Sequence, residues 1–289
     1  LRPKGKNRSE YICVLDGETL PDVGTLARTL PEDLVKSATD KNGKIDEKAL
    51  SLLACEEQRK NSGSAFLPVL FHKVVCMSAV LAEKNGKFIK VNTIEGKDEH
   101  EIIANFLNFI ENHAPKLVSY NGRGFDLPML MIRAMKYNLR APRYYNTSDK
   151  WCNYRTRYDA TWAMDLLDHI SDFRAVSGLR LDTLCAMLGM PGKYDVHGDQ
   201  VLELFYANKP QKIKEYCESD TLNTYWLFLK YELLRGKIDY EQYFSSLEAM
   251  SEFIASNKAN MSYTGPFCEC IEKEIKDFGY LKNELKTEK

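Results

Sequence analysis

The sequence lacks any apolar run that approaches the roughly 18 residues needed for a membrane-spanning helix. Its first ten residues form a basic, polar tail and have no apolar stretch of the kind found in a signal sequence. These two absences argue against a membrane protein and against a secreted one. We therefore expect a cytoplasmic protein that has no membrane partner.

The sequence also lacks an excess of charge of either sign and a regular pattern of cysteines. Its 40 basic and 41 acidic residues nearly cancel, so any polyanion must be held by local groups. Eight cysteines are spread along the chain without a Cys-x-x-Cys pair, which argues against a disulfide scaffold. Cys268 with Cys270, or His72 with Cys76, could offer two ligands to zinc. Neither has a matching second pair, so ordinary thiols are favoured.

No internal repeat or low-complexity linker divides the chain. Its 289 residues and 44% hydrophobic content suffice for one sizeable α/β core with a helical appendage. We expect a basic tail at 1–10, a main domain at 11–238 with a surface insertion at about 21–64, and a helical extension at 239–289.

Hydrophobic patterns predict the order of the main elements. The apolar run 11–15 is typical of a buried strand, and 74–81 and 88–94 are two further β-rich runs. The Asn-Gly pair between the last two is a strong hairpin signal. A helix opened by residues 97–100 and a strand at 116–120 complete a βββαβ order.

The rest of the chain is mainly helical in pattern. A turn at 121–124 leads into a helix, because Pro128 is tolerated in the first helical turn. An apolar segment at about 160–167 is compatible with one more strand. Helical patterns then cover 179–188, 201–206 and 209–234, and two more follow residue 239.

Four acids and one tyrosine occur in three clusters along these elements. Asp16 and Glu18 share one face of a strand, because side chains on a strand alternate between its faces. Asp126 lies at a strand-helix junction. Tyr216 and Asp220 are four residues apart on a helix and point the same way. Clustered carboxylates repel one another unless divalent cations neutralise them, and hard oxygen ligands suit Mg²⁺ or Mn²⁺.

Each cluster taken alone has an ordinary interpretation. An Asp-x-Glu pair is usually solvated charge at a strand end, and Asp126 could cap a helix. Tyr216 and Asp220 could be a boundary aromatic and a surface acid. Their joint occurrence, in this order and on these elements, favours a shared site.

The same three clusters resemble the exonuclease motifs of the DEDD superfamily of 3′-5′ exonucleases, in the DEDDy subclass with tyrosine in the third motif. The matching segments are 14–19 (Val-Leu-Asp-Gly-Glu-Thr), 119–128 and 215–225. The resemblance is to predicted exonucleases related to the proofreading domain of family B DNA polymerases. It spans most of 11–234.

The resemblance implies a ribonuclease H-like α/β fold: a five-stranded mixed sheet, its first three strands antiparallel, flanked by helices, with extra C-terminal helices. It also implies a two-metal hydrolysis of phosphodiester bonds at the 3′ end of single-stranded DNA. Two Mg²⁺ or Mn²⁺ ions would be bound by the four acids, and Tyr216 would orient the attacking water. The residues after the third motif are too few for a polymerase domain. The alternatives are an RNA-trimming exonuclease and an inactive nucleic-acid-binding module.

The resemblance further implies contacts to the substrate strand. Thr19 and Leu20 would receive the terminal sugar and base, and Asn121 and Phe125 would contact the penultimate nucleotide. These four residues flank the acids of the first two motifs. A nucleic-acid 3′ end is thus the partner that the motifs imply.

A second set of binding residues is suggested by composition. Residues 133–158 interleave arginines and lysines with tyrosines and a tryptophan, a pattern typical of a single-strand groove. Arg155 and Arg157 are the predicted strand contacts. The alternative is a solvated loop whose aromatic side chains pack on the core.

Three further residues have weaker claims to a role in the site. Asp165 and Asp168 could assist the acids, but a role at a helix N-terminus is favoured. His197 could act as a general base, as histidine does in the other subclass. Its position well before Asp220 and the presence of Tyr216 argue against that role.

Overall fold

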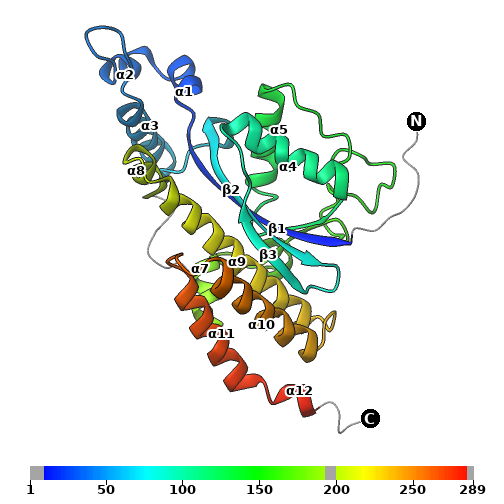
Figure 1. Ribbon diagram of the computed structural model, residues 1–289. Helices are drawn as coiled ribbons and strands as arrows, with labels where there is room; N and C mark the ends of the chain where they lie inside the picture. The colour runs from blue at the N-terminus through cyan, green and yellow to red at the C-terminus, as the bar shows by residue number, and fades with distance from the viewer. Residues whose placement is uncertain (1–9, 193–199, 285–289) are drawn as a thin grey trace.

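A computed structural model describes residues 10–192 and 200–284. Its centre is a five-stranded sheet in the order β3-β2-β1-β4-β5 (Figure 1). β1 and β3 each pair antiparallel with β2, whereas β4 and β5 run parallel to β1. The strands are β1 (Tyr11–Pro21), β2 (His72–Glu83), β3 (Phe88–Thr93), β4 (Lys116–Ser119) and β5 (Ala163–Asp165). The predicted ribonuclease H-like topology is confirmed.

β1 is twice as long as its apolar run predicts. Beyond Leu15 it continues to pair with β2 as far as Pro21, which lies opposite His72, with a bulge between Glu18 and Thr19. The apolar run predicted that the strand ends just before the acids. In the structure, the acids lie within the strand. β4 pairs with β1 only from Ile12 to Val14. The part of β1 that carries Asp16 and Glu18 thus extends beyond the end of β4.

Helices cover both faces of the sheet. α4 (Glu99–His113) and α5 (Asp126–Lys136) lie on one face, and α9 (Pro210–Leu234) and α10 (Tyr240–Asn257) lie on the other (Figure 1). β1 shows the alternation directly, because Ile12 and Val14 join the core under α9, whereas Cys13 and Leu15 join the core under α4 and α5. The order of elements agrees with the predicted βββαβ pattern.

The C-terminal helices are joined to α9 by buried polar contacts. Glu218 of α9 accepts hydrogen bonds from the backbone of Thr93 at 3.0 Å, from Lys258 at 3.0 Å and from Tyr263 at 2.7 Å. These contacts tie β3, the end of α10 and the start of α11 (Thr264–Phe278) to one carboxylate. The shorter helices of the second half are α6 (Leu166–Ile170), α7 (Leu181–Met187), α8 (Val201–Tyr206) and α12 (Leu281–Glu284). The predicted boundary at residue 238 stays a prediction.

The segment between β1 and β2 is helical and has a small core of its own. It contains α1 (Val23–Thr29), α2 (Glu32–Ser37), α3 (Glu47–Ser62) and a short 3₁₀ turn, η1 (Val69–Phe71). Leu26, Leu50 and Leu67 are buried together there. The segment projects from one end of the sheet (Figure 1). In residues 10–192 and 200–284, no helix has both the length and the apolar character required to cross a membrane.

Candidate active site

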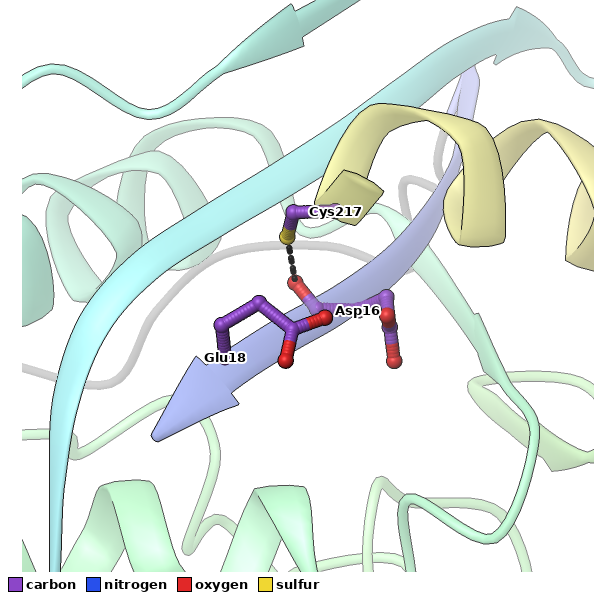
Figure 2. Close-up of side chains that lie close together, drawn as sticks. All are labelled: Asp16, Glu18 and Cys217. Atoms are coloured by element: carbon purple, nitrogen blue, oxygen red, sulfur yellow. Dashed lines mark hydrogen bonds between the residues drawn. The ribbon is translucent and has the colours of Figure 1, made fainter. Parts of the chain in front are cut away.

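The acids of β1 continue the face that the strand buries against α9. Asp16 and Glu18 follow Ile12 and Val14 in the alternation, so their carboxylates emerge on the same side. One carboxylate oxygen of Asp16, one of Glu18 and the Sγ of Cys217 all lie within 4.8 Å of one another (Figure 2). Asp16 and Glu18 therefore lie close together in the folded protein, and α9 lies directly over them.

Cys217 anchors α9 to β1. Its thiol donates to the backbone carbonyl of Asp16 at 3.6 Å (Figure 2). Burial raises the pKa of this thiol well above its usual value, and the neighbouring Cys76, Glu18 and Asp16 act in the same direction. A protonated thiol that donates to a carbonyl is a poor metal ligand, since the thiolate is the binding form. We interpret Cys217 as a positioning residue, which the sequence pattern did not single out.

The third cluster faces the first across this contact. Tyr216 and Asp220 are both 7% exposed and lie on the same side of α9. Burial raises the pKa of the Tyr216 hydroxyl, and the negative charges of Asp220, Glu18 and Asp16 raise it further. Tyr216 is therefore close to acids of both clusters, and it remains a hydrogen-bond donor at neutral pH.

Asp126 approaches from the opposite face of the sheet. It begins α5, as predicted, and its Oδ1 lies 3.6 Å from the position that a Cβ on Gly17 would occupy. Burial, with a smaller contribution from the charge of Asp165, raises the pKa of Asp126 to about 7. All five predicted catalytic residues therefore border β1 near Gly17, but Asp126 and Asp220 do not belong to the group of ligand atoms within 4.8 Å of one another that Asp16 and Glu18 form with Cys217. Their chemical roles remain predictions.

A cation fits this set of donors on chemical grounds. Asp126, Glu18 and Asp220 are each at least nine-tenths buried, and all offer hard carboxylate oxygens. The raised pKa of Asp126 indicates that the site disfavours one more negative charge. A divalent cation would reverse that penalty.

Asp165 shapes the loop that precedes Asp126. It caps α6 by accepting from the backbone N–H groups of Leu167 and Asp168, as the favoured interpretation predicted. It also accepts from the backbone N–H groups of Asn121 at 2.9 Å and Arg123 at 3.0 Å. Asn121 has a left-handed backbone conformation, with φ of 63°. Asp165 therefore stabilises an unusual turn that aims the second motif, a role that the sequence did not reveal.

The four residues predicted to contact the strand have different environments. The side-chain oxygen of Asn121 accepts from Arg174 at 2.7 Å, and Thr19 hydrogen-bonds His72 at 2.8 Å. Phe125 is half-buried beside the ring of His72. Leu20 is only 1% exposed and packs with residues of α8 and α9. Thr19, Asn121 and Phe125 are therefore half-buried, whereas the side chain of Leu20 is covered.

The basic and aromatic segment 133–158 divides between core and surface. Arg133 is 4% exposed and bound to Asp22 and Glu99, and the hydroxyl of buried Tyr154 donates to the carbonyl of Pro115. These two side chains therefore belong to the core, and the strand-binding role of the exposed side chains stays a prediction. The exposed remainder borders a cavity of about 320 Å³ between α5, β5 and the loop. Polar side chains that line this cavity include Arg123, Tyr145, Arg155, Arg157 and Asp165.

Two of the weaker candidates can be placed and one cannot. His72 uses both ring nitrogens in hydrogen bonds, to Thr19 and to the carbonyl of Leu67, so it offers no ligand to zinc. Cys268 hydrogen-bonds Ser251. His197 lies outside the residues that the structure describes.

The fold defines the class of the protein, and comparison with known sequences identifies its family. The mixed sheet places the chain among ribonuclease H-like proteins. Residues 64–271 match the family of predicted 3′-5′ exonucleases related to the exonuclease domain of PolB, the family B DNA polymerase. The chain belongs to this family. The match includes Asp126, Tyr216 and Asp220, and it starts after β1.

Individual relatives are distant and much longer. The catalytic polypeptide of DNA polymerase epsilon from Schizosaccharomyces pombe is 27% identical over 160 residues, which are 52% of this chain and 7% of that protein. A DNA polymerase of Archaeoglobus fulgidus is 24% identical over 131 residues, 44% of this chain and 17% of that protein. A solved family B DNA polymerase from Pyrobaculum calidifontis is 17% identical with a TM-score of 0.45, covering 93% of this chain and 28% of its own.

Proposed function

We propose that the protein is a 3′-5′ exonuclease that hydrolyses phosphodiester bonds at the 3′ end of single-stranded DNA. Asp16, Glu18, Asp126 and Asp220 would hold two divalent cations, Mg²⁺ or Mn²⁺. The observation that carries the proposal is the convergence of β1, α5 and α9 at the part of β1 beyond β4, each bringing a residue of one motif. DNA is favoured over RNA by the polymerase relatives alone.

The residues of the site can divide the work of hydrolysis. The cations, when bound, would lower the pKa of water and offset charge on the scissile phosphate. Tyr216 stays protonated because burial and three nearby acids raise its pKa. It can therefore orient water by donating a hydrogen bond, and it is a poor general base. Cys217 holds α9 against β1, and Asp165 holds the turn before Asp126. Together they fix the relative positions of the three motifs.

The strand would leave the acids along the exposed part of segment 133–158. The Arg155 guanidinium lies 5.2 Å from the ring centroid of Tyr145, and Arg123 donates to the carbonyl of Arg155 at 3.0 Å. A cationic group stacked on an exposed ring is suited to a phosphate flanked by bases. Arg157 is less available, because it forms an ion pair with Asp168.

The proposal is tested by degradation of labelled oligonucleotides. Single-stranded DNA and RNA of the same sequence, each labelled at the 5′ end, are incubated with Mn²⁺ or Mg²⁺ and the purified protein. A ladder that shortens from the 3′ end is expected for DNA, and a 3′-phosphorothioate linkage should slow its start. Asp16→Ala serves as the negative control for a contaminating nuclease.

The outcomes separate the alternatives. Faster shortening of RNA than of DNA would assign the site to RNA trimming. Equal degradation by the wild-type protein and Asp16→Ala would reject the proposed site. Strand binding without shortening, in either metal, would favour an inactive binding module.

A further inference from the structure

An exposed aromatic side chain lies beside the site without a structural reason for its exposure. Phe66 follows α3 and precedes η1, and 58% of its surface is exposed. Its ring centroid lies 4.7 Å from that of His72 and 4.9 Å from that of Phe125. The rings of His72 and Phe125 are also 4.9 Å apart. Three rings therefore form one cluster, with Phe66 as its outer member.

The centre of this cluster is held rigidly. His72 is 5% exposed, and one ring nitrogen lies 2.9 Å from the carbonyl oxygen of Leu67, which can only accept a hydrogen bond. The other nitrogen lies 2.8 Å from the hydroxyl of Thr19. Burial lowers the pKa of His72, so the neutral ring donates to Leu67 and accepts from Thr19. A ring fixed at both nitrogens gives Phe66 and Phe125 a firm support.

The cluster also lies next to two of the acids along the chain. Thr19 directly follows Glu18, and Phe125 directly precedes Asp126. The cluster therefore connects the strand that carries the first motif with the helix that carries the second. Leu20, predicted to receive the terminal base, is buried. An exposed apolar ring in this place is suited to the flat face of a base.

We propose that Phe66, together with Phe125, forms a stacking platform for an unpaired base close to the scissile phosphate. The inference rests on the proposed exonuclease function, and it assigns a substrate contact to the segment between β1 and β2. The substrate class is a single strand whose last bases are unpaired, because a paired base would not offer a free face to the ring. A stacked base would help to hold the strand end while its linkage is cut.

The test compares substitutions that separate stacking from packing. Phe66→Ala should weaken binding of a single strand roughly 5- to 30-fold, measured by fluorescence anisotropy with Ca²⁺ in place of a catalytic ion. Phe66→Trp should bind as tightly as the wild-type protein, and Phe66→Leu should resemble Phe66→Ala. Phe278→Ala, at the far end of α11 and 47% exposed, is the matched control and should change nothing.

Abasic substrates identify the stacked base. Oligonucleotides that lack one base at each of the last few positions are tested with the wild-type protein and Phe66→Ala. At one position the missing base should weaken wild-type binding, and the two proteins should then bind equally well. Equal loss from Phe66→Ala at every position, or full affinity of Phe66→Ala, would overturn the platform.

Failure of this inference can be distinguished from failure of the proposed function. Binding in Ca²⁺ does not require cleavage, so the platform is tested even in a protein that cuts nothing. If the wild-type protein shortens DNA but Phe66→Ala binds normally, the platform alone is rejected. Circular dichroism melts of each variant confirm that the fold is intact.

Discussion

Asp22, which shares Arg133 with Glu99, and Asp126, which lies beside the acids of β1, are buried carboxylates whose pKa values are shifted in opposite directions. Burial would raise the pKa of Asp22, but hydrogen bonds from Arg133, Thr25 and Lys136 bring it below its usual range. For Asp126, burial prevails and raises the pKa to about 7. The two carboxylates therefore differ in how the cost of burial is met.

The structural group, Asp22 with Glu99, contains its own cation. Arg133 donates to Asp22 at 2.6 Å and to Glu99 at 2.7 Å, and Tyr137 adds a hydrogen bond to Glu99. This network joins α5 to the base of α1 and the start of α4. The acids around Asp126, which we propose to be catalytic, are by contrast suited to a cation from solution. In this protein, the acid held by arginine joins structural elements, and the acid with the raised pKa lies at the site that we propose binds a cation.

The largest expected effect is on catalysis by the acids around Asp126. Asp126→Asn should lower the rate of shortening by on the order of a thousandfold, because it removes a charged oxygen ligand while keeping the shape of the side chain. Single-turnover assays with saturating Mn²⁺ measure this rate. Asp98→Asn, which changes an exposed cap of α4 in the same way, should retain full activity. Equal activity of the two variants would refute the catalytic assignment.

The next effect is on stability and concerns the structural group. Arg133→Met should lower the free energy of unfolding by about 3–5 kcal/mol, since Asp22 and Glu99 would remain buried without their cation. Urea denaturation of the metal-free protein measures it. The exposed Arg140→Met is the control and should change little. A loss below about 1 kcal/mol would show that the buried pair contributes far less than its geometry indicates.

Metal binding provides a direct contrast between the groups. Mn²⁺ at about 100 times its dissociation constant should stabilise the wild-type protein by about 2.7 kcal/mol, because the cation binds the folded state. The stabilisation should largely disappear in Asp126→Asn and persist in Asp22→Asn. Thermal melts with and without the ion measure it. An equal shift in both variants would place the ion elsewhere.

A smaller effect is expected in acid. The pKa of Asp22 is lower in the folded protein than in the unfolded chain, so its contribution is present above the unfolded value and is lost as the pH falls. Stability should therefore decline from about pH 5 toward pH 2, and less steeply in Asp22→Asn. Urea denaturation at each pH measures the slope. The same slope in both proteins would assign the acid sensitivity to other carboxylates.

The smallest effect is on strand binding and concerns two arginines that have different partners. Arg157 is neutralised by Asp168, whereas Arg155 is stacked on Tyr145. Arg155→Ala should weaken strand binding by about 1 kcal/mol and reduce its salt dependence by about one phosphate contact. Arg157→Ala should do so less. Anisotropy titrations at several salt concentrations provide the comparison, and a larger effect at Arg157 would contradict it.

The sequence was sufficient for features that depend on local pattern. The Asn-Gly turn gave the hairpin of β2 and β3, and the spacing of Tyr216 and Asp220 gave the shared face of α9. The start of α5 at Asp126 was also predicted correctly. Each of these features is determined by residues within a few positions of one another.

Features that depend on distant partners could not be predicted in this way. β1 continues past Leu15 because β2 pairs with it, and no signal within β1 reveals that partner. Arg133 was assigned to a strand-binding surface, although Asp22 and Glu99 bury it. The burial of Leu20 and the exposure of Phe66 likewise follow from the packing of separate elements. Charge and aromatic content predict an exposed side chain only where no distant residue pairs with it or packs over it.

Because α9 is held on two sides, the positions of the proposed catalytic residues Tyr216 and Asp220 depend on the helices that follow α9. Tyr216 and Asp220 face β1, while Glu218, between them in sequence, is held by Lys258 and Tyr263. α9 is therefore held against β1 on one side and by residues next to α10 and α11 on the other. Truncation after α9 would remove Lys258 and Tyr263, leave Glu218 without these two donors, and weaken the attachment of α9. A shortened version would be a poor guide to the activity of the whole.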